Sequence, residues 1–125
     1  MASKSTHVYK TVGNLEILVD VYTRKTDSSS NRYTINTPVL LFFHGGGAVS
    51  HDRRLLHPHI VQASLQRGWP LVSADYRLLP QASGLDLVED LKDAYAFVRE
   101  ELPSILNISA GPMSNVIVTG QSAGV

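Results

Sequence analysis

The feature that most constrains this chain is a β-branched apolar run that leads directly into a G-x-S-x-G motif. Residues 116–119 read Val-Ile-Val-Thr, and Gly120-Gln-Ser-Ala-Gly124 follows without a gap. Such a run is typical of a buried strand, and the two glycines that flank Ser122 permit a tight strand-to-helix turn. The turn would raise the Ser122 hydroxyl above the sheet and leave the amide of Ala123 free to donate to an oxyanion. Because small-residue turns also produce this motif by chance, its interpretation depends on the rest of the chain.

A second glycine-rich motif follows another apolar run. Residues 39–43 are apolar at consecutive positions, which is typical of a strand covered on both faces in a parallel sheet. His44 comes next, followed by Gly45, Gly46 and Gly47. Successive glycines let main-chain amides approach a ligand closely, as anion stabilisation requires. A flexible linker or a phosphate loop is the alternative. Against the phosphate loop, neither Gly-Lys-Ser/Thr nor a G-x-G-x-x-G spacing is present, and a linker would not explain a His directly before the glycines at the end of a buried strand.

The hydrophobic periodicity predicts an α/β fold in which an antiparallel hairpin leads into a mostly parallel sheet with crossover helices. Residues 7–12 and 15–22 are the expected hairpin, with Glu16 and Asp20 on its solvated face. Strand–helix–strand occurs twice after it, which implies right-handed crossovers. The later strands are expected at residues 39–43, 70–77 and 116–119. The helices between them are expected at residues 58–66 and 86–102.

Local signals set the ends of the two predicted helices. Gly68 is expected to end the first helix, and Asp86 is expected to cap the second, with Glu89 completing a capping box. Pro103 marks the expected end of the second helix.

Two groups of polar residues have both a chemical and a structural interpretation. Asp75 lies at the carboxyl end of a predicted strand, where catalytic groups of α/β folds gather. The adjacent Tyr76 and Arg77 favour a structural carboxylate whose charge is compensated. His57 and His59 could form a metal pair, but no further ligand lies at a recognisable spacing, so no metal site is expected.

Composition excludes several functional classes. The 125 residues carry a net charge of zero, which argues against nucleic acid or an acidic membrane surface as partners. There is no cysteine, and the apolar runs are too short to span a bilayer. The polar N-terminus lacks the apolar core of a signal peptide. We therefore expect one soluble, cytoplasmic domain over residues 1–125, without a cofactor.

Three motifs together resemble one known family. His44-Gly-Gly-Gly47, Ser73-Ala-Asp-Tyr-Arg-Leu-Leu-Pro80 and Gly120-Gln-Ser-Ala-Gly124 are similar, in order and spacing, to the N-terminal part of the hormone-sensitive-lipase-like esterases of the α/β-hydrolase fold. Gln121 and Val125 depart from the residues common in that family. The resemblance implies a nucleophile, Ser122; an oxyanion hole from Gly45, Gly46, Gly47 and Ala123; and supporting motif residues His44, Asp75, Tyr76, Arg77, Gly120 and Gly124.

The same resemblance implies a serine hydrolase that cleaves small-molecule carboxylic esters through an acyl-enzyme. Its triad would follow the order Ser, then Asp or Glu, then His, whereas all five histidines here precede Ser122. We therefore expect a partial domain that ends at the nucleophile elbow, either as a fragment of a longer product or as an inactive truncated form. Amide hydrolysis and a non-catalytic small-molecule receptor, as in the gibberellin receptors that resemble this family, are the alternatives.

Overall fold

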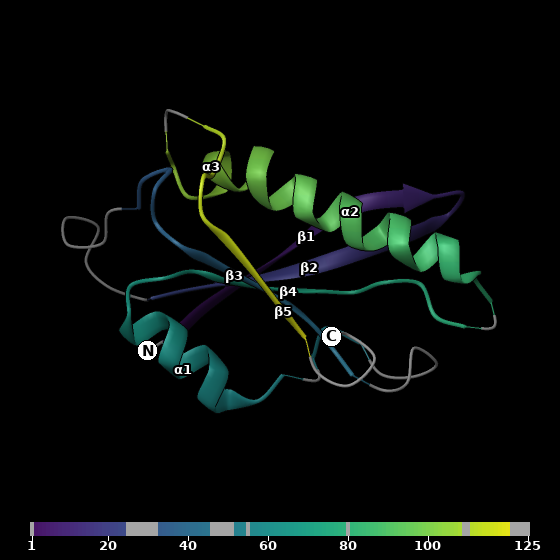
Figure 1. Cartoon of the computed structure of the whole chain (residues 1–125), viewed down its shortest axis with the longest axis horizontal. Coiled ribbons are helices and arrows are strands. Elements are labelled where there is room, and N and C mark those ends of the chain that lie inside the picture. Colours follow the sequence, from purple (N-terminus) through teal and green to yellow (C-terminus); the bar gives the residue numbers. More distant parts are fainter. Residues whose placement is uncertain are drawn as a thin grey trace.

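The fold is a five-stranded mixed sheet with helices on both faces (Figure 1). The computed structural model describes residues 2–24, 33–45, 52–54, 56–79, 81–108 and 111–120. This architecture confirms the predicted hairpin that leads into a mostly parallel sheet. The elements are β1 (Ala2–Val12), β2 (Leu15–Arg24), β3 (Val39–Phe43), α1 (Pro58–Gln66), β4 (Leu71–Ala74), α2 (Gly84–Glu100), α3 (Leu102–Ile105) and β5 (Val116–Gly120).

The strands lie in the order β1-β2-β4-β3-β5. β1 and β2 form the predicted antiparallel hairpin, whose turn contains Gly13 at φ 59°. β2 then pairs antiparallel with β4, whereas β3 runs parallel to both β4 and β5. Phe43 is the register partner of both Ala74 and Gly120. The carboxyl ends of the three parallel strands therefore lie at the same level of one sheet edge.

The two longer helices cover opposite sides of the sheet, with α1 below and α2 above it in Figure 1. On the α2 side, alternate strand residues such as Leu41 and Val72 form one buried cluster with Ala94 and Val98. On the other side, α1 contacts β2 and β4 and buries Leu65. Both faces of β3 are covered, as its continuous apolar run predicts.

The sequence predicts that the face of β2 that carries Glu16 and Asp20 is solvated, and for Asp20 this prediction is wrong. Its side chain is buried, with 0% of its residue surface exposed, whereas Glu16 is exposed as expected. The reason is tertiary, because the segment that carries Arg53 lies over this face. Arg53 Nε donates to Asp20 Oδ1 at 3.0 Å, and Thr6 Oγ1 donates to the same oxygen at 2.6 Å.

The second helix begins earlier than the sequence predicts. Its N-cap is Ser83, and Asp86 occupies the N3 position. The Asp86 amide donates to Ser83 Oγ at 3.1 Å, and the Ser83 amide donates to Asp86 Oδ2 at 2.9 Å. A capping box is therefore present, but with Asp86 as its acidic partner instead of Glu89.

The first strand begins at Ala2, well before the predicted start at residue 7, whereas the helix ends are close to the predictions. Gly68, at φ 77°, follows α1 as expected of a C-terminal glycine. β4 is shorter than predicted because regular pairing stops at Ala74. Pro103 lies at the start of the short α3, directly after α2 ends at Glu100. No described helix combines the length and the apolar character needed to cross a membrane.

Asp90 of α2 joins three parts of the fold and leads to a pH-dependent prediction. It is fully buried and accepts hydrogen bonds from Arg77 Nη2 at 2.8 Å and Lys10 Nζ at 2.9 Å. Burial opposes its ionisation, but the hydrogen bonds from Arg77 and Lys10 outweigh burial and hold the pKa of Asp90 below its usual range.

Replacing Asp90 by Asn should lower the free energy of unfolding at pH 7 by roughly 2–3 kcal/mol, because two cations lose their shared partner. Since the folded-state pKa lies below the unfolded value, the stabilisation is complete above about pH 4 and is lost as the pH falls through the folded pKa. Urea unfolding at pH 7 and near pH 2 tests this. Asp93→Asn, at a carboxylate that is 45% exposed, is the control; an equal loss at both pH values would contradict the prediction.

The outer strand β5 leads to a second prediction. Ile117 and Val118 are 43% and 53% exposed, and β5 pairs with β3 alone among the described strands. Exposed apolar edge strands promote association between chains. The purified 125-residue chain should therefore self-associate at micromolar concentrations.

Replacing Ile117 and Val118 by Lys should raise the monomer fraction in light scattering. Leu85→Lys is the matched control, since Leu85 is 82% exposed but lies on α2, away from the strand edge. A wild-type chain that stays monomeric over the same concentrations would refute the role of β5.

Candidate functional site

The candidate site lies where the parallel strands end. β3 ends at Phe43 and β5 at Gly120, and these two residues are register partners on adjacent strands. The chain therefore enters the His44-Gly45 motif and the G-x-S-x-G motif from neighbouring points of one sheet edge. His44, Gly45 and Gly120 belong to the described residues. The predicted site residues outside the described part of the chain are Gly46, Gly47, Ser122, Ala123 and Gly124.

The start of the glycine motif is held by Tyr76, which follows β4. The Tyr76 hydroxyl donates to the His44 carbonyl oxygen at 2.7 Å. The two rings also stack, with centroids 4.3 Å apart and planes 12° from parallel. His44 is fully buried, and burial raises the pKa of Tyr76, so this phenol stays protonated as a donor at neutral pH.

The His44 ring is oriented toward its own backbone. Nδ1 lies 2.7 Å from the Gly45 carbonyl oxygen, and because a carbonyl can only accept, Nδ1 carries the hydrogen. The buried Nε2 has no hydrogen-bond partner among the described residues. The ring thus shapes the start of the glycine motif and is not directed at a neighbouring hydroxyl in that part of the chain.

Asp75 has the structural surroundings that its sequence context favours, but with a different partner. Arg53, 22 positions away, donates to it through Nη1 at 2.9 Å and through its backbone amide at 2.8 Å. Arg77, the expected neighbour, pairs instead with Asp90 of α2. Sequence analysis missed Arg53 because nothing in the spacing links it to Asp75. It missed Asp90 because an acidic residue in an amphipathic helix is usually exposed.

The hydrogen bonds of Arg77 fix the chain after β4 to helix α2. Its Nε and Nη2 donate to Asp90, and its backbone amide donates to Asp90 Oδ2 at 2.8 Å. The hydrogen bonds to Asp90 raise the pKa of Arg77 above its already high value. The site edge is therefore connected to the core helix through an ion pair that is charged at neutral pH.

No candidate metal ligands gather among the described residues. His57 and His59 stack on each other at a centroid separation of 4.7 Å, at the exposed start of α1. No group of three or more His, Asp or Glu side chains in the described segments is arranged to hold an ion.

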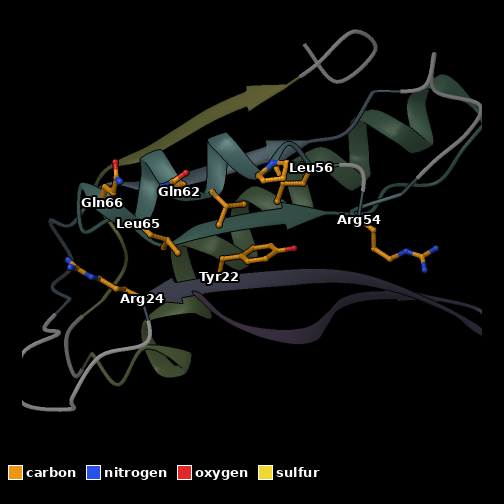
Figure 2. A pocket seen from close by; sticks show the side chains of 9 residues that line it. Tyr22, Arg24, Arg54, Leu56, Gln62, Leu65 and Gln66 are labelled. Atoms are coloured by element: carbon orange, nitrogen blue, oxygen red, sulfur yellow. The ribbon is translucent and has the colours of Figure 1, made fainter. Parts of the chain in front are cut away.

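A cavity of about 600 Å³ lies between β2 and α1 (Figure 2). Tyr22 and Arg24 line it from β2, and Gln62 and Leu65 line it from α1. None of the described candidate site residues is part of its wall. This cavity therefore belongs to the packing between α1 and the hairpin and not to the edge where β3 and β5 end.

Comparison with known proteins identifies the fold family of the chain. The family model of the alpha/beta hydrolase fold matches residues 40–125. Lipase 2 of Moraxella sp. is 33% identical over 118 residues, which are 92% of this chain and 26% of that protein. Probable carboxylesterase M8 of Phoma sp. is 34% identical over 109 residues, which are 81% of this chain and 33% of that protein.

One curated relative is a much larger protein, and solved esterase structures share the fold. Non-reducing polyketide synthase atr1 of Stereocaulon alpinum is 32% identical over 123 residues, which are 93% of this chain and 5% of the synthase. A bacterial heroin esterase superposes with a TM-score of 0.76 at 25% identity, over 98% of this chain and 36% of that structure. Esterase 2 of Thermogutta terrifontis has the same TM-score and identity, over 96% of this chain and 40% of that structure.

The relatives are much longer than this chain. It spans about a third of the length of probable carboxylesterase M8 and less of the other two curated relatives. Within that span, the matched residues include all three motifs from His44 to Gly124. The chain belongs to the α/β-hydrolase fold family, in its hormone-sensitive-lipase-like group.

Proposed function

We propose that this chain provides the nucleophile and the oxyanion hole of a serine hydrolase that cleaves carboxylic esters. The observation that carries the proposal is the pairing of β3 with β5, which brings the ends of both motif-bearing strands to one register level. An esterase needs its attacking oxygen and its oxyanion donors within about 3 Å of one carbonyl group. Adjacent strand ends supply such proximity.

In the proposed mechanism, the Ser122 oxygen attacks the ester carbonyl carbon and the carbonyl electrons move onto oxygen. Backbone amides of Gly46, Gly47 and Ala123, with Gly45 at the start of the motif, donate to that oxyanion. The general base takes the proton of Ser122 and gives it to the departing alcohol as the intermediate collapses, which leaves an acyl group on Ser122. Water, deprotonated by the same base, then releases the acid and restores the serine. Amides help most because they meet a charge that is fully developed only in the transition state.

We infer that the base and its orienting acid come from sequence that follows Ser122, as in the Ser, Asp or Glu, His order of this fold. Of the histidines that the structure describes, His44 is buried against Gly45, and His57 and His59 lie at the exposed start of α1. His7 lies on β1, where it pairs with Val19. The much greater length of the relatives leaves room for both groups.

The polyketide synthases among the relatives favour a second possibility, in which the site belongs to one domain of a much larger protein. In it, the same strand-end chemistry operates as one domain of a very large chain, of which these residues are a few per cent. The mass of the full polypeptide, measured by mass spectrometry of the protein from its natural source, distinguishes this arrangement from a stand-alone esterase.

Replacing Ser122 by Ala in the natural full-length protein should lower ester turnover by about 10⁴-fold or more, because triad residues act as a unit. Burst kinetics with a chromogenic short-chain ester measure the loss, and circular dichroism should show an unchanged fold. Ser104→Ala, at an exposed position of α3, is the matched control and should keep full activity. An undiminished burst in Ser122→Ala would remove this residue from the mechanism, and tight binding of the ester without turnover in the wild type would favour a receptor.

Replacing Gly46 or Gly47 by Val should lower kcat by roughly 10²- to 10³-fold and leave KM nearly unchanged, because a β-branched side chain would shift the backbone amide away from the oxyanion, with an effect like that of losing one donor. Gly84→Val serves as the control, because a Cβ added there meets no atom within 4 Å. Steady-state kinetics over a range of ester concentrations separate the two constants. A rise in KM alone would show that the glycines form a binding surface instead.

A further inference from the structure

Both ends of the segment that contains the three glycines are attached to the end of β4. At the start, the His44 carbonyl oxygen accepts the hydrogen bond from Tyr76. At the far end, the Arg53 amide donates to Asp75 Oδ1 at 2.8 Å, and the Arg53 carbonyl accepts from Ser73 Oγ at 2.7 Å. His44 and Arg53, which flank residues 45–52 (hereafter the glycine segment), are thus bonded to the same strand end.

The guanidinium of Arg53 strengthens the second attachment. Its Nη1 donates to Asp75 Oδ2 at 2.9 Å, and its Nε donates to Asp20 Oδ1 at 3.0 Å. Burial works against the charge, but hydrogen bonds and charges from Asp20 and Asp75 raise the pKa of Arg53. A planar guanidinium can reach two carboxylates at once with defined geometry, which an ammonium group matches poorly.

Stability alone is a weak reason for such an arrangement. Asp20 is fully buried, and its second oxygen, Oδ2, has no hydrogen-bond partner in the described part of the chain. Burying a carboxylate is costly, and an apolar pair of similar size often stabilises a fold equally well. The arrangement does fix the position of Arg53 relative to the sheet, because this side chain joins β2, the end of β4 and the end of the glycine segment.

The adjacent residue, Arg54, forms only a local ion pair, in contrast to Arg53. Arg54 donates to Asp52 through Nη2 at 2.7 Å, but the pair is only two residues apart in sequence and the Arg54 side chain is 74% exposed. Such a local pair cannot fix the segment against the sheet. Of these two adjacent arginines, Arg53 is the one that links the glycine segment to distant strands.

We propose that Arg53, acting through Asp75 and Asp20, is a positioning residue that sets where the glycine segment presents its amides to the oxyanion. This inference rests on the proposed ester hydrolysis. Arg53 does not touch the substrate in this scheme. It acts because a displacement of about 1 Å in a catalytic donor can lower turnover by about 10²-fold.

The test uses the natural full-length protein with three variants. Arg53→Met alone leaves Asp20 buried without its cation, so it is combined with Asp20→Asn, which removes the unpaired charge. Arg53→Lys keeps the positive charge but loses the planar guanidinium that reaches both carboxylates. Arg54→Met is the matched control. Melting temperatures identify any variant that fails to fold, and Arg53→Lys then carries the test.

The first readout is independent of activity. Amide hydrogen exchange of residues 45–52, followed by mass spectrometry, should be at least tenfold faster in the Arg53→Met/Asp20→Asn variant than in the wild type or in Arg54→Met. Unchanged exchange in this segment would overturn the inference, whether or not the protein is an esterase.

The second readout separates positioning from binding and from general stability. We expect kcat to fall by about 10- to 100-fold with KM within threefold. The affinity for a trifluoromethyl ketone, which forms an oxyanion on the enzyme, should fall by the same factor, while the affinity for a matched amide inhibitor should not change. Arg53→Lys should lie between the wild type and the double variant.

The failures are distinguishable. An active wild type whose Arg53 variants keep their affinity for the ketone within twofold would overturn the role of Arg53 and leave the esterase proposal intact. A wild type that neither hydrolyses the ester nor is labelled at Ser122 by an organophosphate would overturn the proposed function and, with it, the catalytic part of this inference.

Discussion

The parallel register of β4, β3 and β5 is the constraint on which the candidate site depends. Because Phe43 pairs with both Ala74 and Gly120, three chain segments leave the sheet at one level. Side-chain contacts then only need to orient segments that the backbone has already brought together. A shift of two residues in this register would move the motifs about 7 Å apart along the strand direction. The apolar runs that bury β3 therefore also align the site.

Three consecutive residues after β4 each connect the strand end to a different part of the molecule. Asp75 binds Arg53, Tyr76 binds His44, and Arg77 binds Asp90 of α2. The sequence Asp-Tyr-Arg thus acts as a junction in which a carboxylate, a phenol and a guanidinium each find a partner of complementary chemistry. Such a junction explains how residues that do not attack the substrate can belong to a motif linked with catalysis.

Patterns of short range predict most of the fold. The apolar run at residues 39–43 is β3, and the helical periodicity after Pro58 is α1. Helix α2 begins earlier than predicted, because Asp86 fits an N-cap as well as the N3 position it occupies, and Ser83 supplies the cap instead. The burial of Asp20 and the pairing of Asp75 with Arg53 depend on contacts across 33 and 22 residues. Period-2 alternation carries no information about what later covers a strand, so neither contact could be predicted from local pattern.

The two halves of the proposed site differ in how firmly the described residues hold them. The glycine segment is attached at both ends through His44 and Arg53, by bonds to the backbone and to side chains of the strand-end junction. β5, which leads to Ser122, is held by pairing with β3, while Ile117 and Val118 remain half exposed on its two faces. In the proposed esterase, oxyanion stabilisation requires donors that do not reorganise during the reaction, and the bonds of His44 and Arg53 to the strand end would serve that requirement. In the same proposal, the position of the nucleophile would depend on contacts to the half-exposed faces of β5, and these contacts differ from the ones that hold His44 and Arg53.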